Sequence, residues 1–269
     1  MKINNAIGSI AIGSFDGLHL GHQALISQAE MVIVIERNGG YLTPGYKRSF
    51  YTDRPLTLYH FEKIKSLTPE AFVAKLQQDF PSLEKIVIGY DFHFGNGKAG
   101  DGHYLQKIFD GEVLIIEQVS MAGIPVHSRT IKKLLREGDI SLANQLLGRS
   151  YQLDGTIIPG QGLGSKALVP TLNLSVDHYQ LPQEGVYATY TQIDGSWLPS
   201  ISFIGHRVST DGSFAVETHI LHREIPTPSS DTLWIRFEAF IRPNRKFDTL
   251  DALKREIIKN IQTAEEILQ

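Results

Sequence analysis

The sequence predicts an α/β fold in two parts: an N-terminal domain with a parallel sheet, and a C-terminal domain built mainly from antiparallel strands. The chain has 269 residues, a length that favours two domains and allows a substantial core. Before about residue 148, short apolar segments alternate with helix-like ones. After it, strand-like segments are separated by Gly, Pro, Asp and Ser. We therefore expect domains at 1–147 and 148–269.

Four apolar segments of the N-terminal domain are predicted to be buried strands: 9–15, 31–36, 85–89 and 112–117. Helical spacing predicts helices at 23–30, 61–67, 69–80 and 104–109. Short apolar strands separated by helices indicate a parallel sheet with right-handed crossovers. The stretch 37–59, with Gly, Pro and several aromatic residues, is predicted to be irregular.

The second half of the chain changes from helices to strands. Two helices are predicted at 131–135 and 142–147, and then six strands at 151–158, 171–176, 185–193, 200–204, 215–221 and 233–241. A series of short antiparallel strands indicates a small barrel or a sandwich. Helical periodicity returns at Thr249 and continues to the end of the chain.

The composition excludes several classes of function. The chain has 26 basic and 29 acidic residues and a net charge of −3. It therefore lacks the excess of positive charge that is typical of proteins that bind nucleic acid or a membrane surface. The chain has no cysteine, which excludes disulfides and thiolate metal sites. It has neither a signal-peptide pattern nor an apolar run near the ~18 residues of a membrane span. We expect a soluble cytoplasmic protein that acts on small molecules.

A glycine-rich turn follows the first predicted strand and ends on two histidines. Residues 13–22 read Gly-Ser-Phe-Asp-Gly-Leu-His-Leu-Gly-His, and a helix-like run follows. Strand, glycine-rich turn and helix in this order commonly present backbone N–H groups to a phosphate. His19 and His22 share one face of the first helical turn, so both can reach the same polyphosphate. The structural alternative is that both histidines cap a helix.

A second polar segment follows the third predicted strand. Residues 89–101 read Gly-Tyr-Asp-Phe-His-Phe-Gly-Asn-Gly-Lys-Ala-Gly-Asp, just beyond a strand's carboxyl end, where open α/β sheets bind ligands. Asp91 can hydrogen-bond a ribose, a base or a flavin edge. The glycines allow the backbone to approach a ligand closely.

These two segments together resemble the adenylyltransferase domain of the bacterial FAD synthetases, the bifunctional riboflavin kinase/FMN adenylyltransferases. The resemblance implies a Rossmann-like nucleotidylyltransferase domain that transfers AMP from ATP to FMN and releases pyrophosphate, with His19 and His22 as catalytic residues. It implies nucleotide or phosphate contacts at Gly13, Phe15, Asp16, Gly17, Gly21, Ser128, Arg129 and Lys132. It implies flavin contacts at Asp91, Phe92, His93, Phe94 and Gly95.

The C-terminal half carries two further motifs, Gly-x-Gly-x-Gly-x-Lys leading to Pro-Thr-x-Asn at 160–173, and Val-Glu-Thr-His at 216–219. They resemble riboflavin kinase, which implies a β-barrel. In that family Pro-Thr-x-Asn supplies magnesium contacts and the glutamate accepts the proton of the ribityl 5′-hydroxyl. The resemblance carries these roles to Thr171 and Asn173 as metal ligands and to Glu217 as general base. It implies phosphate contacts at Gly160, Gly162, Gly164 and Lys166. Taken alone, the glycines would indicate a hairpin turn.

We therefore expect an enzyme that makes FMN from riboflavin and ATP, and then FAD from FMN and ATP, with Mg²⁺ at both steps. One alternative keeps only the kinase, because residues 35–44 replace the Phe-x-Pro-His-Pro-like segment of the family. Another is a non-catalytic flavin or nucleotide sensor. A third, adenylylation or cytidylylation of a different phosphorylated substrate, is disfavoured by the paired flavin-type motifs.

Overall fold

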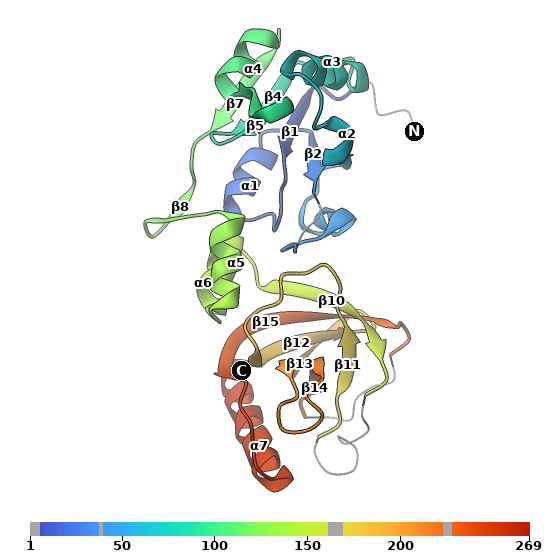
Figure 1. Cartoon of the computed structure of the whole chain (residues 1–269), viewed down its shortest axis with the longest axis vertical. Helices are drawn as coiled ribbons and strands as arrows, with labels where there is room; N and C mark the ends of the chain where they lie inside the picture. The colour runs from blue at the N-terminus through green and yellow to red at the C-terminus, as the bar shows by residue number, and fades with distance from the viewer. Residues whose placement is uncertain (1–5, 38–39, 161–168, 223–227) are drawn as a thin grey trace. The chain divides into compact units, whose positions relative to one another are not determined.

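A computed structural model of the chain describes residues 6–37, 40–160, 169–222 and 228–269 (Figure 1). It contains two compact units, Met1–Ser128 and Arg129–Gln269. The predicted domain boundary between residues 147 and 148 stays a prediction. In the described part of the chain, no helix has both the length and the apolar character needed to cross a bilayer.

The first unit contains a five-stranded parallel sheet in the order β3-β2-β1-β4-β7. Its strands are β1 (Ser9–Gly13), β2 (Met31–Glu36), β3 (Leu56–His60), β4 (Lys85–Gly89) and β7 (Glu112–Ile116). The predicted parallel sheet is confirmed. Strand β3 overlaps the stretch 37–59 that was predicted to be irregular, because pairing with β2 at the sheet edge orders a short segment that has no strong pattern of its own.

Helices cover both faces of this sheet. Helix α1 (Leu20–Ile26) packs on one face, and α2 (Phe61–Ile64), α3 (Pro69–Asp79) and α4 (Gly102–Ile108) pack on the other. Successive side chains of β1 point to opposite faces of the sheet. Ile10 and Ile12 pack in the core on the face covered by α3, and Ala11 packs in the core on the face covered by α1. Both faces are buried, which is why the strands read as continuous apolar runs.

Short elements complete the first unit. They are η1 (Gly45–Tyr51), β5 (His93–Phe94) paired with β6 (Gly100–Asp101), η2 (Asn96–Lys98), and β8 (Ser120–Met121) paired with β9 (Ile124–Pro125).

The centre of the sheet is a topological switch point. From β1 the chain continues to β2 on one side, and it later returns to β4 on the other side of β1. Ligands of open α/β sheets bind outside the carboxyl ends of the strands at such a point. The histidine turn follows β1, and Asp91 follows β4. Because these strands are parallel neighbours, both predicted segments lie at the carboxyl end of the sheet.

The second unit is a closed barrel with helices. α5 (Ser128–Arg136) and α6 (Ile140–Leu147) precede it, and α7 (Leu250–Ile267) follows it (Figure 1). The six antiparallel strands have the order β10-β11-β14-β13-β12-β15. They are β10 (Tyr151–Ile158), β11 (Leu172–Ser175), β12 (Gly185–Ile193), β13 (Ser196–His206), β14 (Phe214–Ile220) and β15 (Thr232–Pro243). Of the barrel and the sandwich, the barrel is confirmed.

The two faces of the barrel wall differ in chemistry. Val186, Ala188 and Ile201 pack outward against Ala264 of α7. The opposite face of the same strands carries a buried cluster of five hydroxyl groups, which we call the hydroxyl cluster: Thr189, Thr191, Ser200, Ser202 and Thr218. Their oxygens bond one another at 2.7–3.1 Å. Buried polar groups need such partners, so each hydroxyl depends on its neighbours.

We predict that Thr218→Val destabilises the barrel by about 1–3 kcal/mol, because Thr191 and Ser202 each lose a buried hydrogen-bond partner. Urea unfolding followed by tryptophan fluorescence measures this, since both tryptophans, Trp197 and Trp234, lie on barrel strands. The matched control is Thr156→Val on an exposed position of β10, expected within about 0.5 kcal/mol of the parent. Equal effects of the two substitutions would contradict the prediction.

Candidate active sites

The histidine turn places two imidazole rings face to face. His19 is the N-cap of α1, and its Nδ1 accepts the backbone N–H of His22 at 3.2 Å. The two rings stack with their centroids 3.5 Å apart. Because Nδ1 of His19 is an acceptor, the proton of the neutral ring lies on Nε2, which is then a donor. The sequence-based interpretation of a shared face is confirmed, and the helix begins earlier than predicted because His19 caps it.

The backbone of this turn is strained. Phe15 and Leu18 are fully buried and have φ values of 45° and 41°, in the left-handed region that side chains disfavour. Gly17 shares this region, with a φ of 90°. At Gly21 an added Cβ would lie 3.2 Å from the His19 ring, so a glycine there permits the close approach of the helix. Strain of this kind concentrates at ligand sites.

Asp16, a predicted nucleotide contact, has a structural role in the turn. Its Oδ1 accepts the backbone N–H groups of Leu42 and Thr43 at 2.7 and 3.1 Å. Its carbonyl oxygen accepts the hydroxyl of Ser128 at 2.7 Å, which brings another predicted contact to the same turn. Asp16 therefore ties the turn to two distant segments, and its contact with a nucleotide stays a prediction.

Arg48 is a residue of this site that sequence reasoning missed. Its side chain is 1% exposed and pairs with Glu36 at 2.6 Å. Its Nε donates to the carbonyl oxygen of Phe15 at 3.2 Å, and its Nη1 donates to that of Gly45 at 3.1 Å. Burial, together with the charge of Glu36, raises the pKa of the neighbouring Tyr41 to about 12. Arg48 thus fixes the turn from a segment where the sequence predicts only irregular structure.

The predicted flavin segment divides into exposed and buried residues. Asp91 and His93 are exposed, and His93 Nδ1 lies 3.0 Å from the carbonyl oxygen of Asp91. Phe94 is buried and packs against Phe72 and Phe92. Gly95 has a φ of 76° and leaves no room for a Cβ beside Pro69. Asp91 and His93 can therefore meet a ligand directly, whereas Phe94 supports the segment from the core.

Two predicted phosphate contacts belong to the other compact unit. Arg129 and Lys132 lie on α5, where Arg129 is exposed and Lys132 half-buried. Their roles stay predictions.

Gly13, another predicted phosphate contact, is the last residue of β1 and lies next to the ring of Phe15.

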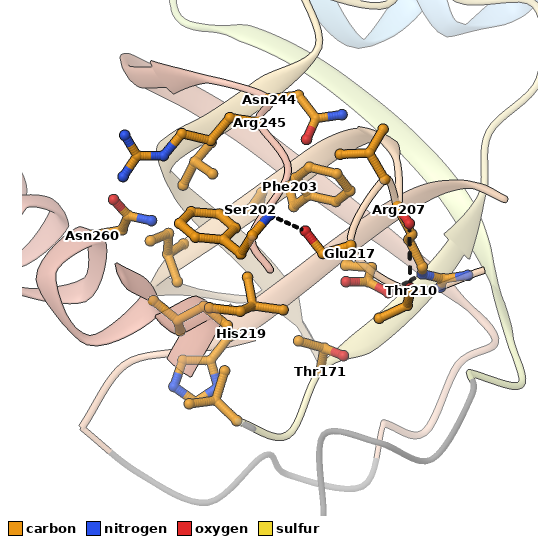
Figure 2. Close-up of a pocket in the computed structure, with 18 of the residues that line it drawn as sticks. Thr171, Ser202, Phe203, Arg207, Thr210, Glu217, His219, Asn244, Arg245 and Asn260 are labelled. Atoms are coloured by element: carbon orange, nitrogen blue, oxygen red, sulfur yellow. Dashed lines mark hydrogen bonds and ion pairs between the residues drawn. The ribbon is translucent and has the colours of Figure 1, made fainter. Parts of the chain in front are cut away.

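In the barrel, strand pairing brings the predicted kinase residues together. Asn173 on β11 pairs directly with Glu217 on β14, and Thr171 precedes β11 by one residue. Glu217 also pairs with Phe203 on β13. All four side chains line one cavity of about 360 Å³ (Figure 2). The structure therefore collects three predicted residues from two separate motifs at one place.

An arginine missed by sequence reasoning joins two of these residues. Arg207 donates to Glu217 Oε1 through Nε at 2.9 Å and through Nη2 at 2.6 Å. The same Nη2 donates to Asn173 Oδ1 at 2.6 Å. Figure 2 shows Arg207 and Glu217 side by side at the cavity wall. No local sequence signal identifies Arg207, because its partners lie 10 and 34 residues away.

The rest of the cavity is lined partly by the end of β15, by α7 and by the segment that joins them. Apolar side chains there include Phe247, Leu253 and Ile257. Arg242 donates to Asn260 Oδ1 at 3.3 Å, and burial lowers its pKa. One cavity thus combines a polar end, with Glu217, and an apolar wall, as small-molecule sites commonly do.

The predicted phosphate loop is described only at its start. At Gly160 an added Cβ would lie 2.4 Å from Asn173 Nδ2, so a larger residue here would displace the Asn173 side chain. Gly162, Gly164 and Lys166 fall outside the described residues. His219 supports the following segment, because its Nδ1 lies 2.7 Å from the carbonyl oxygen of Pro170.

Comparison with known proteins identifies the family. A riboflavin kinase model matches residues 147–268, and a FAD synthetase model matches residues 2–36 and 49–130. A bifunctional riboflavin kinase/FMN adenylyltransferase of Listeria monocytogenes is 30% identical, with 94% of this chain and 90% of that protein covered. A protein of the same description from Pseudomonas fluorescens is 29% identical, with the same coverage. The chain belongs to the bifunctional riboflavin kinase/FMN adenylyltransferase family.

A solved structure supports the fold. The crystal structure of a Streptococcus pneumoniae protein described as a macrolide-efflux protein superposes with a TM-score of 0.84. It is 24% identical, and the superposition covers 98% of this chain and 97% of that one. At this identity the likeness concerns the fold alone.

We predict that Arg48→Met lowers the free energy of unfolding by about 3–5 kcal/mol, because it leaves Glu36 as an uncompensated, largely buried charge. Urea unfolding followed by circular dichroism measures the change. Arg54→Met is the matched control: its pair with Asp53 is exposed, and we expect less than about 1 kcal/mol. The double variant Arg48→Met, Glu36→Gln should recover part of the loss; no recovery would argue against the buried ion pair.

Proposed function

We propose that this chain performs both reactions of its family at the residues described above. The barrel phosphorylates riboflavin with ATP to give FMN and ADP, and the first unit adenylylates FMN with ATP to give FAD and pyrophosphate. The observation that carries the proposal is that Thr171, Asn173 and Glu217 line the same cavity. Both reactions consume ATP, so we place the protein in the cytoplasm with riboflavin, FMN and ATP as its small-molecule partners.

In the kinase reaction, Glu217 acts as the general base. Its carboxylate accepts the proton of the ribityl 5′-hydroxyl as that oxygen attacks the γ-phosphorus of ATP, and ADP leaves. A positioned base contributes typically ~10²–10⁴-fold to the rate. The apolar wall of the cavity, with Phe247, Leu253 and Ile257, suits the isoalloxazine ring.

The donors at the polar end of the cavity fit magnesium. Thr171 offers a hydroxyl and Asn173 an amide oxygen, and such hard oxygen ligands suit Mg²⁺. Among the described residues no group of three or more His, Asp or Glu side chains is arranged to hold a metal. We therefore propose that these two residues hold Mg²⁺ together with phosphate oxygens of ATP. Bound magnesium would neutralise charge on the transferring phosphoryl group.

In the adenylyl transfer, the histidine turn holds the phosphates of ATP. A phosphate oxygen of FMN attacks the α-phosphorus, and pyrophosphate leaves. Because Nδ1 of His19 accepts a hydrogen bond, the neutral ring carries its proton on Nε2, and we propose that this N–H donates to the phosphates. His22, stacked on that ring, is proposed to donate to the same phosphates. Asp91 and His93, at the end of the neighbouring strand, are proposed to meet the flavin.

A single assay tests this function. The pure protein is incubated with riboflavin, Mg²⁺ and ATP, and riboflavin, FMN and FAD are separated by chromatography. We expect FMN to form and then FAD. FMN without FAD would leave only the kinase, and no turnover would contradict both activities.

Two substitutions test the division of labour. We predict that Glu217→Gln reduces FMN formation by about 10²-fold or more, because the amide cannot accept the proton, while FAD formation from supplied FMN is kept. We predict the converse for His22→Ala. The rates of both reactions are measured for each variant, and circular dichroism confirms folding. If either substitution slowed both reactions equally in a folded protein, the proposed assignment of sites would be wrong.

A further inference from the structure

We propose that Arg207 is a positioning residue of the kinase site with two linked effects. It orients Glu217 so that one carboxylate oxygen is available to the substrate hydroxyl, and it competes with magnesium for the amide oxygen of Asn173. Arg207 therefore raises turnover while it weakens metal binding. This inference rests on the proposed kinase function.

The orientation of Glu217 follows from which oxygen Arg207 uses. Both of its bonds, from Nε at 2.9 Å and from Nη2 at 2.6 Å, go to Oε1. No group in the described part of the chain donates a hydrogen bond to Oε2. The guanidinium thus restricts the carboxylate to one arrangement and leaves the second oxygen for a ligand in the cavity that Glu217 lines. Reactive groups need this kind of restriction to meet a substrate in productive geometry.

Arg207 is itself held in place. It follows β13 directly, its Nη1 donates to the Ser213 hydroxyl at 2.8 Å, and its backbone N–H donates to the Ser213 carbonyl oxygen at 2.8 Å. The preceding residue, His206, donates its backbone N–H to Glu184 at 3.0 Å. The Arg207 side chain is only 16% exposed. Anchored on both sides, it is a fixed element of the cavity wall.

Competition with the metal follows from Asn173. Nη2 of Arg207 donates to Asn173 Oδ1 at 2.6 Å, and this is the oxygen proposed to bind Mg²⁺. Two cations that share one oxygen repel each other strongly in a partly buried site. Magnesium binding therefore requires the Asn173 amide to turn its oxygen away from Nη2, while Arg207 keeps its bonds to Glu217. Removal of the guanidinium should relieve this repulsion.

The test compares full-length Arg207→Ala and Arg207→Lys with the parent protein in two measurements. For FMN formation, we expect kcat of the alanine variant to fall by about 10- to 100-fold, with KM for riboflavin within about threefold, because the base is misplaced but not removed. The second measurement is calorimetric titration with ADP at increasing Mg²⁺. There we expect the half-saturating Mg²⁺ concentration to fall about threefold or more.

Matched controls separate positioning from stability. Arg236→Ala removes another Arg–Glu pair of the same barrel, at 2.8 Å and outside the cavity, and should change neither measurement. Circular dichroism and urea unfolding followed by tryptophan fluorescence verify that the barrel of each variant is folded, since both tryptophans lie on barrel strands. Arg207→Lys keeps the charge but not the planar fork, so we expect its kcat to be reduced and its metal dependence to stay close to the parent's.

The outcomes are distinguishable. A folded Arg207→Ala protein with parental kcat would overturn the positioning role. A half-saturating Mg²⁺ concentration that stays the same or rises would overturn the competition, as would an equal fall for the lysine variant. If the parent protein formed no FMN, the proposed function itself would fail, whereas the calorimetric comparison would still decide the competition at Asn173.

Discussion

The strand register of the closed barrel is the constraint on which the kinase site depends. Glu217 faces Asn173 on one neighbouring strand and Phe203 on the other, and side chains alternate between the two faces of each strand. A shift of one residue would turn Glu217 toward the barrel interior and Thr218 toward the cavity. The hydroxyl cluster opposes such a shift, because it satisfies its hydrogen bonds only when Thr218 points inward. The hydroxyl cluster inside the barrel and the cavity residues outside it therefore require the same strand pairing.

Both sites use an arginine that belongs to no recognisable motif. Arg48 holds the backbone of the histidine turn, and Arg207 holds the carboxylate of Glu217. The FAD synthetase model matches up to residue 36 and resumes at residue 49, so Arg48 lies in the unmatched interval. The turn is therefore supported by a residue from an interval that the family model does not match. A planar guanidinium suits the task, because it can donate to several acceptors in fixed directions.

Elements whose pattern is local could be predicted from the sequence, and those that depend on distant partners could not. Strands β2, β4, β10 and β12 have the predicted bounds, since apolar runs and turn residues mark both of their ends. Strand β3 was missed because its order comes from pairing with β2. The motifs also predicted roles for Asn173 and Glu217, which the fold brings together at one cavity. Arg48 and Arg207 were missed because composition shows a charge but not the buried carboxylate that will neutralise it.

The hydroxyl cluster also influences how the barrel responds to temperature. Unfolding raises the heat capacity in proportion to the apolar surface that becomes hydrated, and hydration of polar surface lowers it. Part of this interior consists of Thr and Ser side chains bonded to one another instead of hydrocarbon alone. The heat-capacity increment of unfolding is then smaller than that of a purely apolar barrel of equal size. A smaller increment gives a flatter stability curve, so the barrel retains a similar margin of stability in the cold and in the heat.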